Sequence, residues 1–234
     1  MYRKVFKTGG IYEVYEYEKL NTKNGGVLDG DGEFRKENYA QRMRSRRNKI
    51  RRLICENFDS ASKFVTLTFA DTELFDITDV KQCNHQLKLF VKRIKYQYSD
   101  FKYVAVIEFQ KRGAIHYHMI CNLPYIKKAE LQRIWGLGFV KINAIDKVDN
   151  VGAYVIKYMT IDMDDDRLQG EQGYLRSKTL REPQEYCNWK EPDKTEYLKI
   201  MKSLKGKSPT YGGEPFVSEN TGKTTYSQYN TNRE

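Results

Sequence analysis

Hydrophobic and polar residues alternate with two different periods in the middle of the chain, and these periods predict its elements. A period of two among β-branched and aromatic residues predicts strands, whereas apolar spacings of three and four predict amphipathic helices. The predicted strands are 64–70, 102–109, 114–122 and 139–145, and the predicted helices are 78–98, 127–135 and about 150–160. Their order indicates an α+β fold, a split-βαβ ferredoxin-like sandwich with a central antiparallel sheet.

The flanking segments are more polar. Residues 2–18 alternate around Gly9-Gly10, which predicts a hairpin. The Gly/Asn/Asp-rich residues 21–33 indicate a mobile loop, and residues 203–234 have the composition of a partly disordered tail. We therefore predict four parts: an N-terminal hairpin and flexible loop (1–34), a basic helix (35–57), a core domain (58–165) and a polar, partly disordered C-terminal extension (166–234).

Composition and charge narrow the class of protein. The 39% hydrophobic and 13% aromatic residues suffice for a globular core, which argues against a wholly disordered chain. The net charge of +10 favours a polyanionic partner such as nucleic acid, with ordinary basic solubility as the alternative interpretation. The four scattered cysteines lack zinc-finger spacing, and no segment has the length of a membrane span. We expect a cytoplasmic protein with reduced thiols and no membrane partner.

Two of the three histidines, His116 and His118, lie two residues apart in a predicted strand. Residues i and i+2 of a strand share one face, so both imidazoles point the same way. Glu108, on the preceding strand, lies roughly opposite them once the hairpin turns near residues 111–113. Two nitrogens and one hard oxygen suit Mg²⁺ or Mn²⁺ at a phosphate. The alternative is that the two histidines decorate an exposed sheet face.

The last predicted helix carries Tyr154, Lys157 and Tyr158 on one face, at positions i, i+3 and i+4. A tyrosine oxygen can accept a phosphoryl group, and a nearby lysine can hold the phosphate or stabilise the phenolate. The same helix also fits an ordinary core-facing stripe formed with Val151 and Val155.

The three motifs, taken in order, resemble those of the HUH endonucleases, the rolling-circle replication initiators (Rep proteins) of small phages, plasmids and single-stranded DNA viruses. The strand motif is FVTLTF at 64–69, the His-hydrophobic-His motif is His116-Tyr117-His118, and the tyrosine motif is YVIKY at 154–158. The two tyrosines with an intervening lysine look most like the microvirus and filamentous-phage branch. The resemblance covers about residues 60–160.

This resemblance implies a role for each matching residue. Glu108, His116 and His118 are expected to hold the Mg²⁺ or Mn²⁺ ion that polarises the scissile phosphate. Tyr154 is expected to attack, forming a 5′-phosphotyrosine and freeing a 3′-hydroxyl, while Lys157 steadies the phosphate or the attacking oxygen. Tyr158 is either a second nucleophile or a core residue. The protein is then a metal-dependent nickase and joiner that starts rolling-circle replication in the cytoplasm of a bacterial host.

The predicted basic helix offers a surface for the DNA backbone. Seven cations within eleven residues favour a phosphate-tracking surface, although a solvated helix face is the common role of such a run. These residues are Arg42, Arg44, Arg46, Arg47, Lys49, Arg51 and Arg52.

The expected partner is a single-stranded DNA origin, with a stem-loop or nick site. Gly222-Lys223-Thr224 does not complete a phosphate-binding loop because Val217 stands where such a loop needs glycine, so we expect a host helicase and polymerase to assist. The sequence leaves the oligomeric state open. Two alternatives remain: another HUH enzyme, either a relaxase or a tyrosine transposase, and a non-catalytic single-stranded nucleic-acid-binding protein.

Overall fold

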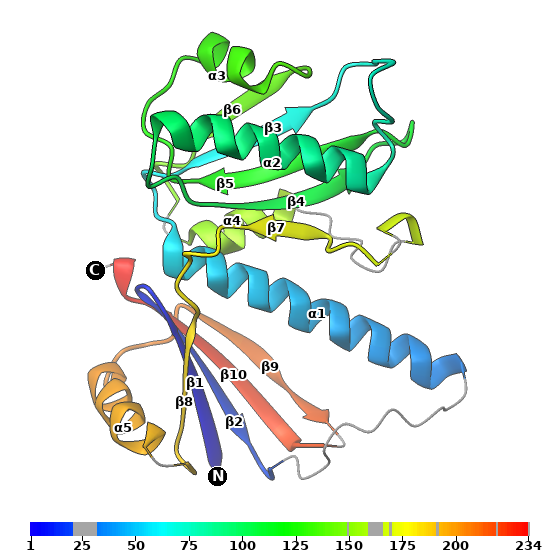
Figure 1. The fold of residues 1–234 in the computed structure, drawn as a ribbon. Coiled ribbons are helices and arrows are strands. Elements are labelled where there is room, and N and C mark those ends of the chain that lie inside the picture. Colours follow the sequence, from blue (N-terminus) through cyan, green and yellow to red (C-terminus); the bar gives the residue numbers. More distant parts are fainter. Residues whose placement is uncertain are drawn as a thin grey trace. The chain divides into compact units, whose positions relative to one another are not determined.

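The computed structural model describes two compact units (Figure 1). Unit 1 comprises Met1–Arg42 and Glu182–Glu234, and unit 2 comprises Met43–Arg181; each is considered by itself. The described residues are 1–20, 32–148, 150–158, 166–168, 170–190, 192–218 and 220–233. The mobile loop predicted at 21–33 therefore lies almost entirely outside them.

Unit 2 is built on a five-stranded antiparallel sheet with the order β6-β3-β5-β4-β7. The strands are β3 (Lys63–Thr68), β4 (Tyr103–Phe109), β5 (Ile115–Cys121), β6 (Val140–Ala144) and β7 (Tyr174–Arg176). The helices are α2 (Val80–Gln97), α3 (Lys128–Trp135) and α4 (Val151–Tyr158), followed by the short η1 (Asp166–Leu168). The predicted α+β fold with a central antiparallel sheet is confirmed, and β7 adds an edge strand beside β4 that the sequence did not indicate.

The two faces of this sheet carry separate apolar cores. On one face, α2 and α3 pack over the odd-numbered side chains of the central strands, such as Leu67 and Tyr117. On the other face, the part of α1 that belongs to unit 2 packs with α4 over Phe64, Val106 and Ile120. Because side chains alternate along a strand, the second face is also the one that carries His116 and His118.

Helix α1 (Gly32–Asn57) begins in unit 1, and its residues from Met43 onward lie in unit 2. Its buried residues include Ile50, Leu53 and Ile54, which form the weak apolar stripe predicted from the sequence. At Gly152, at the start of α4, an added Cβ would lie 2.5 Å from both Arg51 O and Cys55 Sγ. This contact shows that α4 and α1 approach as closely as only glycine allows.

Unit 1 contains a second five-stranded antiparallel sheet, with the order β8-β1-β2-β10-β9. Its strands are β1 (Tyr2–Thr8), β2 (Ile11–Tyr17), β8 (Gln184–Cys187), β9 (Tyr211–Ser218) and β10 (Gly222–Asn230). Helix α5 (Asp193–Leu204) packs Tyr197, Ile200 and Leu204 against Val5 and Val14 of the sheet, and η2 (Thr231–Arg233) ends the unit. The predicted hairpin is confirmed, with Thr8 paired to Ile11 across Gly9-Gly10.

The C-terminal segment differs from its prediction as an irregular, partly disordered extension. Residues 211–218 and 222–230 form β9 and β10, and β10 pairs with β2 along most of its length. The stabilising partner of β10 lies about 200 residues earlier in the chain, so local composition did not reveal the strand. The Tyr and Thr residues of β10 fit a half-buried strand once this partner is present.

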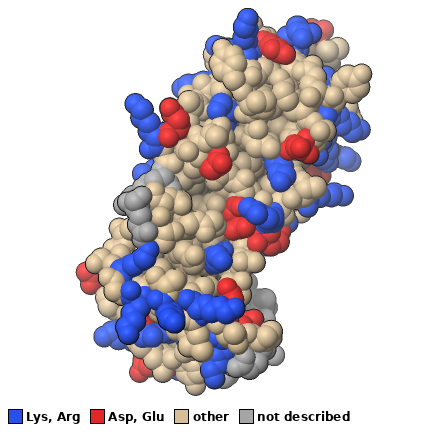
Figure 2. Space-filling view, turned by 90° about the vertical axis from the view of Figure 1, so that its left-hand side faces the viewer, with Lys and Arg blue, Asp and Glu red and all other residues tan. Residues whose placement is uncertain are grey.

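The positive charge is divided unequally between the units. Unit 2 contains 25 Lys and Arg against 16 Asp and Glu, whereas unit 1 contains 16 against 15. Figure 2 shows Lys and Arg forming a band over unit 1 on the side where α5 lies. Acidic residues elsewhere in unit 1 balance this band, so the excess charge that favours a polyanion belongs to unit 2. Among the described helices, none combines the length and apolar character needed to cross a bilayer.

Candidate functional site

The β4–β5 hairpin brings Glu108, His116 and His118 together on one face of the unit 2 sheet. Glu108 is paired in register with His116, and Val106 with His118. Directly paired residues share a face, which places all three functional side chains side by side. The Oε2 atom of Glu108 contacts Nε2 of His118. The register expected from the sequence is therefore present.

His118 is held from the neighbouring strand β3. Its Nδ1 lies 3.2 Å from Oγ1 of Thr66, which is its register partner. Its ring also stacks on Phe64, with 5.8 Å between centroids and 9° between the ring planes. The side chain is 14% exposed, against 36% for Glu108. These contacts fix the imidazole on both sides and leave its Nε2 directed toward Glu108.

His116 lies at the less covered end of the same face. Burial lowers the pKa of His116, and the neighbouring His118 and Arg112 act in the same direction, while Glu108 opposes them. His116 is therefore neutral at neutral pH, and a neutral imidazole is the form that binds a metal ion.

Tyr117, between the two histidines, points to the opposite face. Its hydroxyl donates a hydrogen bond to Oδ1 of Asn84 on α2, at 2.8 Å. The side chain is fully buried, and burial raises its pKa well above the usual value. This phenol ties the histidine strand to α2 and holds the register of β5.

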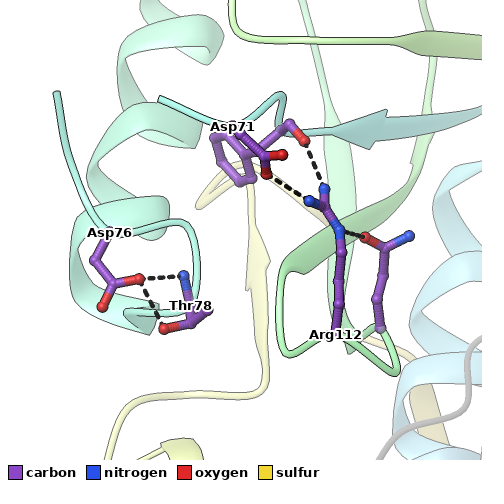
Figure 3. Close-up of polar contacts among 6 residues, drawn as sticks. Asp71, Asp76, Thr78 and Arg112 are labelled. Carbon is purple, nitrogen blue, oxygen red and sulfur yellow. Dashed lines mark hydrogen bonds and ion pairs between the residues drawn. The ribbon is translucent and has the colours of Figure 1, made fainter. Parts of the chain in front are cut away.

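Arg112, in the turn of the hairpin, connects it to the segment after β3 (Figure 3). Its guanidinium binds the Asp71 carboxylate at 2.5 Å, the Phe69 carbonyl at 3.3 Å and the Gln110 side chain at 3.2 Å. In the same view, the Asp76 carboxylate accepts hydrogen bonds from the backbone N–H and the hydroxyl of Thr78. These bonds lower the pKa of Asp76.

A second connection joins the same two segments: the Ile115 N–H donates to the Ile77 carbonyl at 2.9 Å. The end of the hairpin that carries Glu108 and His116 is thus tied to the segment after β3 at two points.

Helix α4 carries the predicted nucleophile over the same sheet face. Its first turn is capped by Asn150, whose Oδ1 accepts the Ala153 N–H at 2.9 Å. Tyr154 is half-buried and packs against the apolar cluster beneath α4, whereas Lys157 is exposed. Tyr158 ends the helix, and its side chain lies outside the described part of the structure. Tyr154 therefore combines both roles weighed from the sequence, since it is a core contact placed at the layer that adjoins the histidines.

The donor chemistry of Glu108, His116 and His118 fits a divalent cation, because it offers two imidazole nitrogens and one carboxylate. Within the described residues, however, no three His, Cys, Asp or Glu side chains are already spaced as a metal-binding group. The direct contact between Glu108 and His118 occupies the space that a shared ligand would need. A bound ion requires these two side chains to separate.

Most of the predicted DNA-binding cations of α1 reach the surface. Arg44, Arg46 and Arg47 are exposed, and Lys49, Arg51 and Arg52 are exposed or half-buried. The side chain of Arg42 lies outside the described part. These residues, Arg42 excepted, belong to the more basic unit 2.

Thr66, Phe64 and Arg112 did not emerge as site residues from the sequence. Alternation along β3 was a usable signal, since Phe64 and Thr66 share a face while Val65 and Leu67 enter the opposite core. Linking them to His118 required the β3–β5 register, which a single sequence does not provide.

Residues 62–163 match the family model of replication-associated protein ORF2. The matched segment is less than half of the chain but includes β3, the β4–β5 hairpin and α4, and so contains Glu108, both histidines and Tyr154. The match supports a relationship with rolling-circle replication initiators and a role in replication initiation. No curated protein and no solved structure matches the chain.

Proposed function

We propose that this protein is an HUH-type endonuclease that initiates rolling-circle replication by nicking and rejoining single-stranded DNA. The observation that carries the proposal is the grouping of Glu108, His116 and His118 on one sheet face, within the segment that matches a replication-associated family. The further likeness to the microvirus and filamentous-phage branch rests on the Tyr154-Lys157-Tyr158 spacing.

The three grouped side chains would hold Mg²⁺ or Mn²⁺. Such an ion, when bound, polarises a phosphate oxygen and stabilises the charge that develops on it. Thr66 and Phe64 keep the His118 ring in one orientation, so that its Nε2 faces the open side of the site. Orientation by neighbouring groups of this kind commonly changes metal affinity or activity by roughly 10- to 100-fold.

Tyr154 would supply the nucleophile. Its phenolic oxygen forms a bond to the scissile phosphorus while the bond from phosphorus to the 3′-oxygen breaks. The 5′-phosphate remains on the tyrosine, and the 3′-hydroxyl leaves with a proton and serves as a primer. Lys157, exposed on the same helix, would balance the charge of the phosphate or the phenolate. Tyr158 is the candidate second nucleophile for the reverse transfer.

The basic part of α1 would hold the DNA backbone, with affinity that falls as salt concentration rises. The proposed substrate is a single-stranded or stem-loop origin, and host helicase and polymerase would carry out unwinding and synthesis. We place the protein in the cytoplasm of a bacterial host.

Covalent trapping tests the proposal. A labelled single-stranded oligonucleotide from a candidate origin is incubated with the protein and Mn²⁺, and an adduct is sought on a denaturing gel. We expect an adduct that is lost in the Tyr154→Phe/Tyr158→Phe double variant. Tyr96→Phe is the matched control, because Tyr96 is 93% exposed on α2. No adduct on any origin strand, or an adduct that survives the double variant, contradicts the proposal.

A second comparison separates an enzyme from a simple binding protein. His116→Ala should abolish the adduct while largely keeping DNA affinity, because the cations supply most of the affinity. His85→Ala is its control, since His85 is exposed on α2. Equal loss of adduct and affinity in His116→Ala, or DNA binding without an adduct in the unmodified protein, favours a non-catalytic nucleic-acid-binding protein.

A further inference from the structure

A groove of about 750 Å³ lies between α2 and the edge of the unit 2 sheet at β7. One side is formed by successive turns of α2 at Lys88, Val91 and Lys95, and the other by β7 and the residues on either side of it. Its apolar residues Val91 and Leu175 belong to, or pack on, the core beneath α2 and α3, whereas the histidines face the opposite core. The groove is therefore separate from the Glu108–His116–His118 group.

The charge of the groove selects an anionic occupant. Four cations line it, and Glu171 is the one carboxylate among its lining residues. The cations are Lys88, Lys95, Arg176 and Lys178. Both lysines of α2 lie on its outer surface seven residues apart, about 10 Å along the helix, so they can meet different phosphates of one strand.

The floor of the groove is apolar and aromatic. Val91 and Tyr103 are 9% and 6% exposed, and Leu175 is half-buried beside them. Burial raises the pKa of Tyr103, so its phenol stays neutral and its surface adds no charge to the floor. An apolar floor between cationic walls suits nucleobases that are not paired, and this combination is typical of single-strand binding.

The groove is also rigid where β4 and β7 meet. The Tyr103 N–H donates to Oγ of Ser177 at 3.1 Å, and the Ser177 N–H donates to the Tyr103 carbonyl at 3.0 Å. Ser177 is buried. A preformed groove of this kind loses little conformational entropy when a ligand binds.

The sheet register relates the groove to the proposed cleavage site. Tyr174 of β7 is paired with Val106, which is paired with His118. Two strand spacings are about 10 Å, so the edge strand lies only a few nucleotides from the histidines. A strand that leaves the site across β4 reaches β7 and then the groove beyond it.

We propose that this groove binds the single-stranded DNA that flanks the nick, with phosphates on Lys88, Lys95 and Lys178 and bases over Val91 and Tyr103. This inference rests on the proposed function, because it takes the substrate to be single-stranded DNA. It adds a second contact region, separate from the basic helix α1 and from the site of the chemistry.

Equilibrium binding tests the groove without cleavage. The full chain is titrated with a labelled single-stranded oligonucleotide in EDTA, at several salt concentrations, and the Lys88→Gln/Lys95→Gln double variant is compared with Lys81→Gln/Lys92→Gln. The second pair is the matched control, since both of its lysines are exposed on α2 outside the groove lining.

We expect the groove variant to lose affinity about 10-fold and its slope of log affinity against log salt to become shallower by roughly 1.4, for two lost phosphate contacts. The control should stay within about twofold. The difference should vanish with oligonucleotides too short to span from the site to the groove.

Three results overturn the proposal: equal losses in both double variants, no loss in the groove variant, or displacement of the strand by a free mononucleotide. The affinity assay is independent of adduct formation. If the unmodified protein forms an adduct and the two double variants bind alike, the groove proposal alone fails. If no adduct forms but only the groove variant binds weakly, the proposed nicking function fails and the groove remains.

Discussion

The carboxylate of Glu108 contacts the imidazole of His118, although the residue paired with Glu108 across the hairpin is His116. The contact runs diagonally across two strands rather than along the register. It leaves His116 beside the pair with a neutral, half-buried ring. Glu108 and His118 must therefore separate before both can bind one ion together with His116.

The hydroxyl of Thr66 offers a direct test of how His118 is oriented. Thr66→Val keeps the size of the side chain but removes the hydrogen bond to Nδ1. We expect Mn²⁺ affinity, measured by calorimetry, to fall roughly 10- to 100-fold, with a loss of unfolding free energy of about 1 kcal/mol.

Thr68→Val is the control for that change, because the Thr68 hydroxyl bonds the Phe139 carbonyl instead of a histidine. It should cost similar stability and leave Mn²⁺ affinity near that of the unmodified protein. Equal Mn²⁺ affinity in the two variants would show that Thr66 does not orient His118.

Gly152 reports on the closeness of α4 and α1. In Gly152→Ala the new Cβ meets Arg51 O and Cys55 Sγ at 2.5 Å, so α4 must shift. We expect a loss of about 1–3 kcal/mol in urea unfolding and a slower covalent adduct, because Tyr154 moves with the helix. Gly212→Ala is the control, since its nearest neighbour would lie 3.9 Å away. An unchanged unfolding midpoint for Gly152→Ala contradicts this packing.

Arg112 should matter more for local rigidity than for global stability. Arg112→Lys keeps the charge but loses the forked contacts to Phe69 and Gln110. Because Asp71 is 81% exposed, we expect less than about 1 kcal/mol of lost stability. Amide hydrogen exchange across residues 110–116 should accelerate, whereas Lys111→Gln, at an exposed neighbour, should leave it unchanged. Identical exchange in both variants would mean that Arg112 does not anchor the hairpin.

Buried thiols predict alkaline sensitivity. Burial raises the pKa of Cys83 and of Cys121 to about 12, above an unfolded value near about 8.5. As pH rises above about 8.5 the unfolded chain releases these protons while the folded chain keeps them, so the unfolding free energy falls as pH increases toward about 12.

Denaturant unfolding at several alkaline pH values measures this effect, and Cys83→Ala should reduce its slope. A slope that is unchanged in Cys83→Ala would show that this thiol does not contribute. Cys187→Ala is the comparison, because that thiol is also buried but lies in unit 1.

The sequence predicted unit 2 well because its elements are defined by local periodicity. The α2 stripe of Leu87, Phe90 and Ile94 and the alternation in β5 depend only on near neighbours. Glu108 was placed opposite the histidines by counting across a short turn. The contact between Thr66 and His118 was not predictable in this way, because β3 and β5 are separated by a helix and another strand.

Unit 1 was harder to predict for the same physical reason. The first hairpin is local, and its turn residues Gly9-Gly10 identified it. The pairing of Ile11 with Asn230 joins positions more than 200 residues apart, and no local signal specifies it. The strands β9 and β10 are polar and glycine-containing, so the sheet supplies the order that their composition does not indicate.

The composition of unit 1 from both ends of the sequence has a consequence for synthesis. Unit 2 is continuous from Met43 to Arg181, so all of its strands are available while later residues are still being added. The central strand β2 must wait for β10, whose last residue is Asn230. We infer that the nuclease core acquires its structure first on the ribosome, and that the N-terminal hairpin has one edge unpaired until translation is nearly finished.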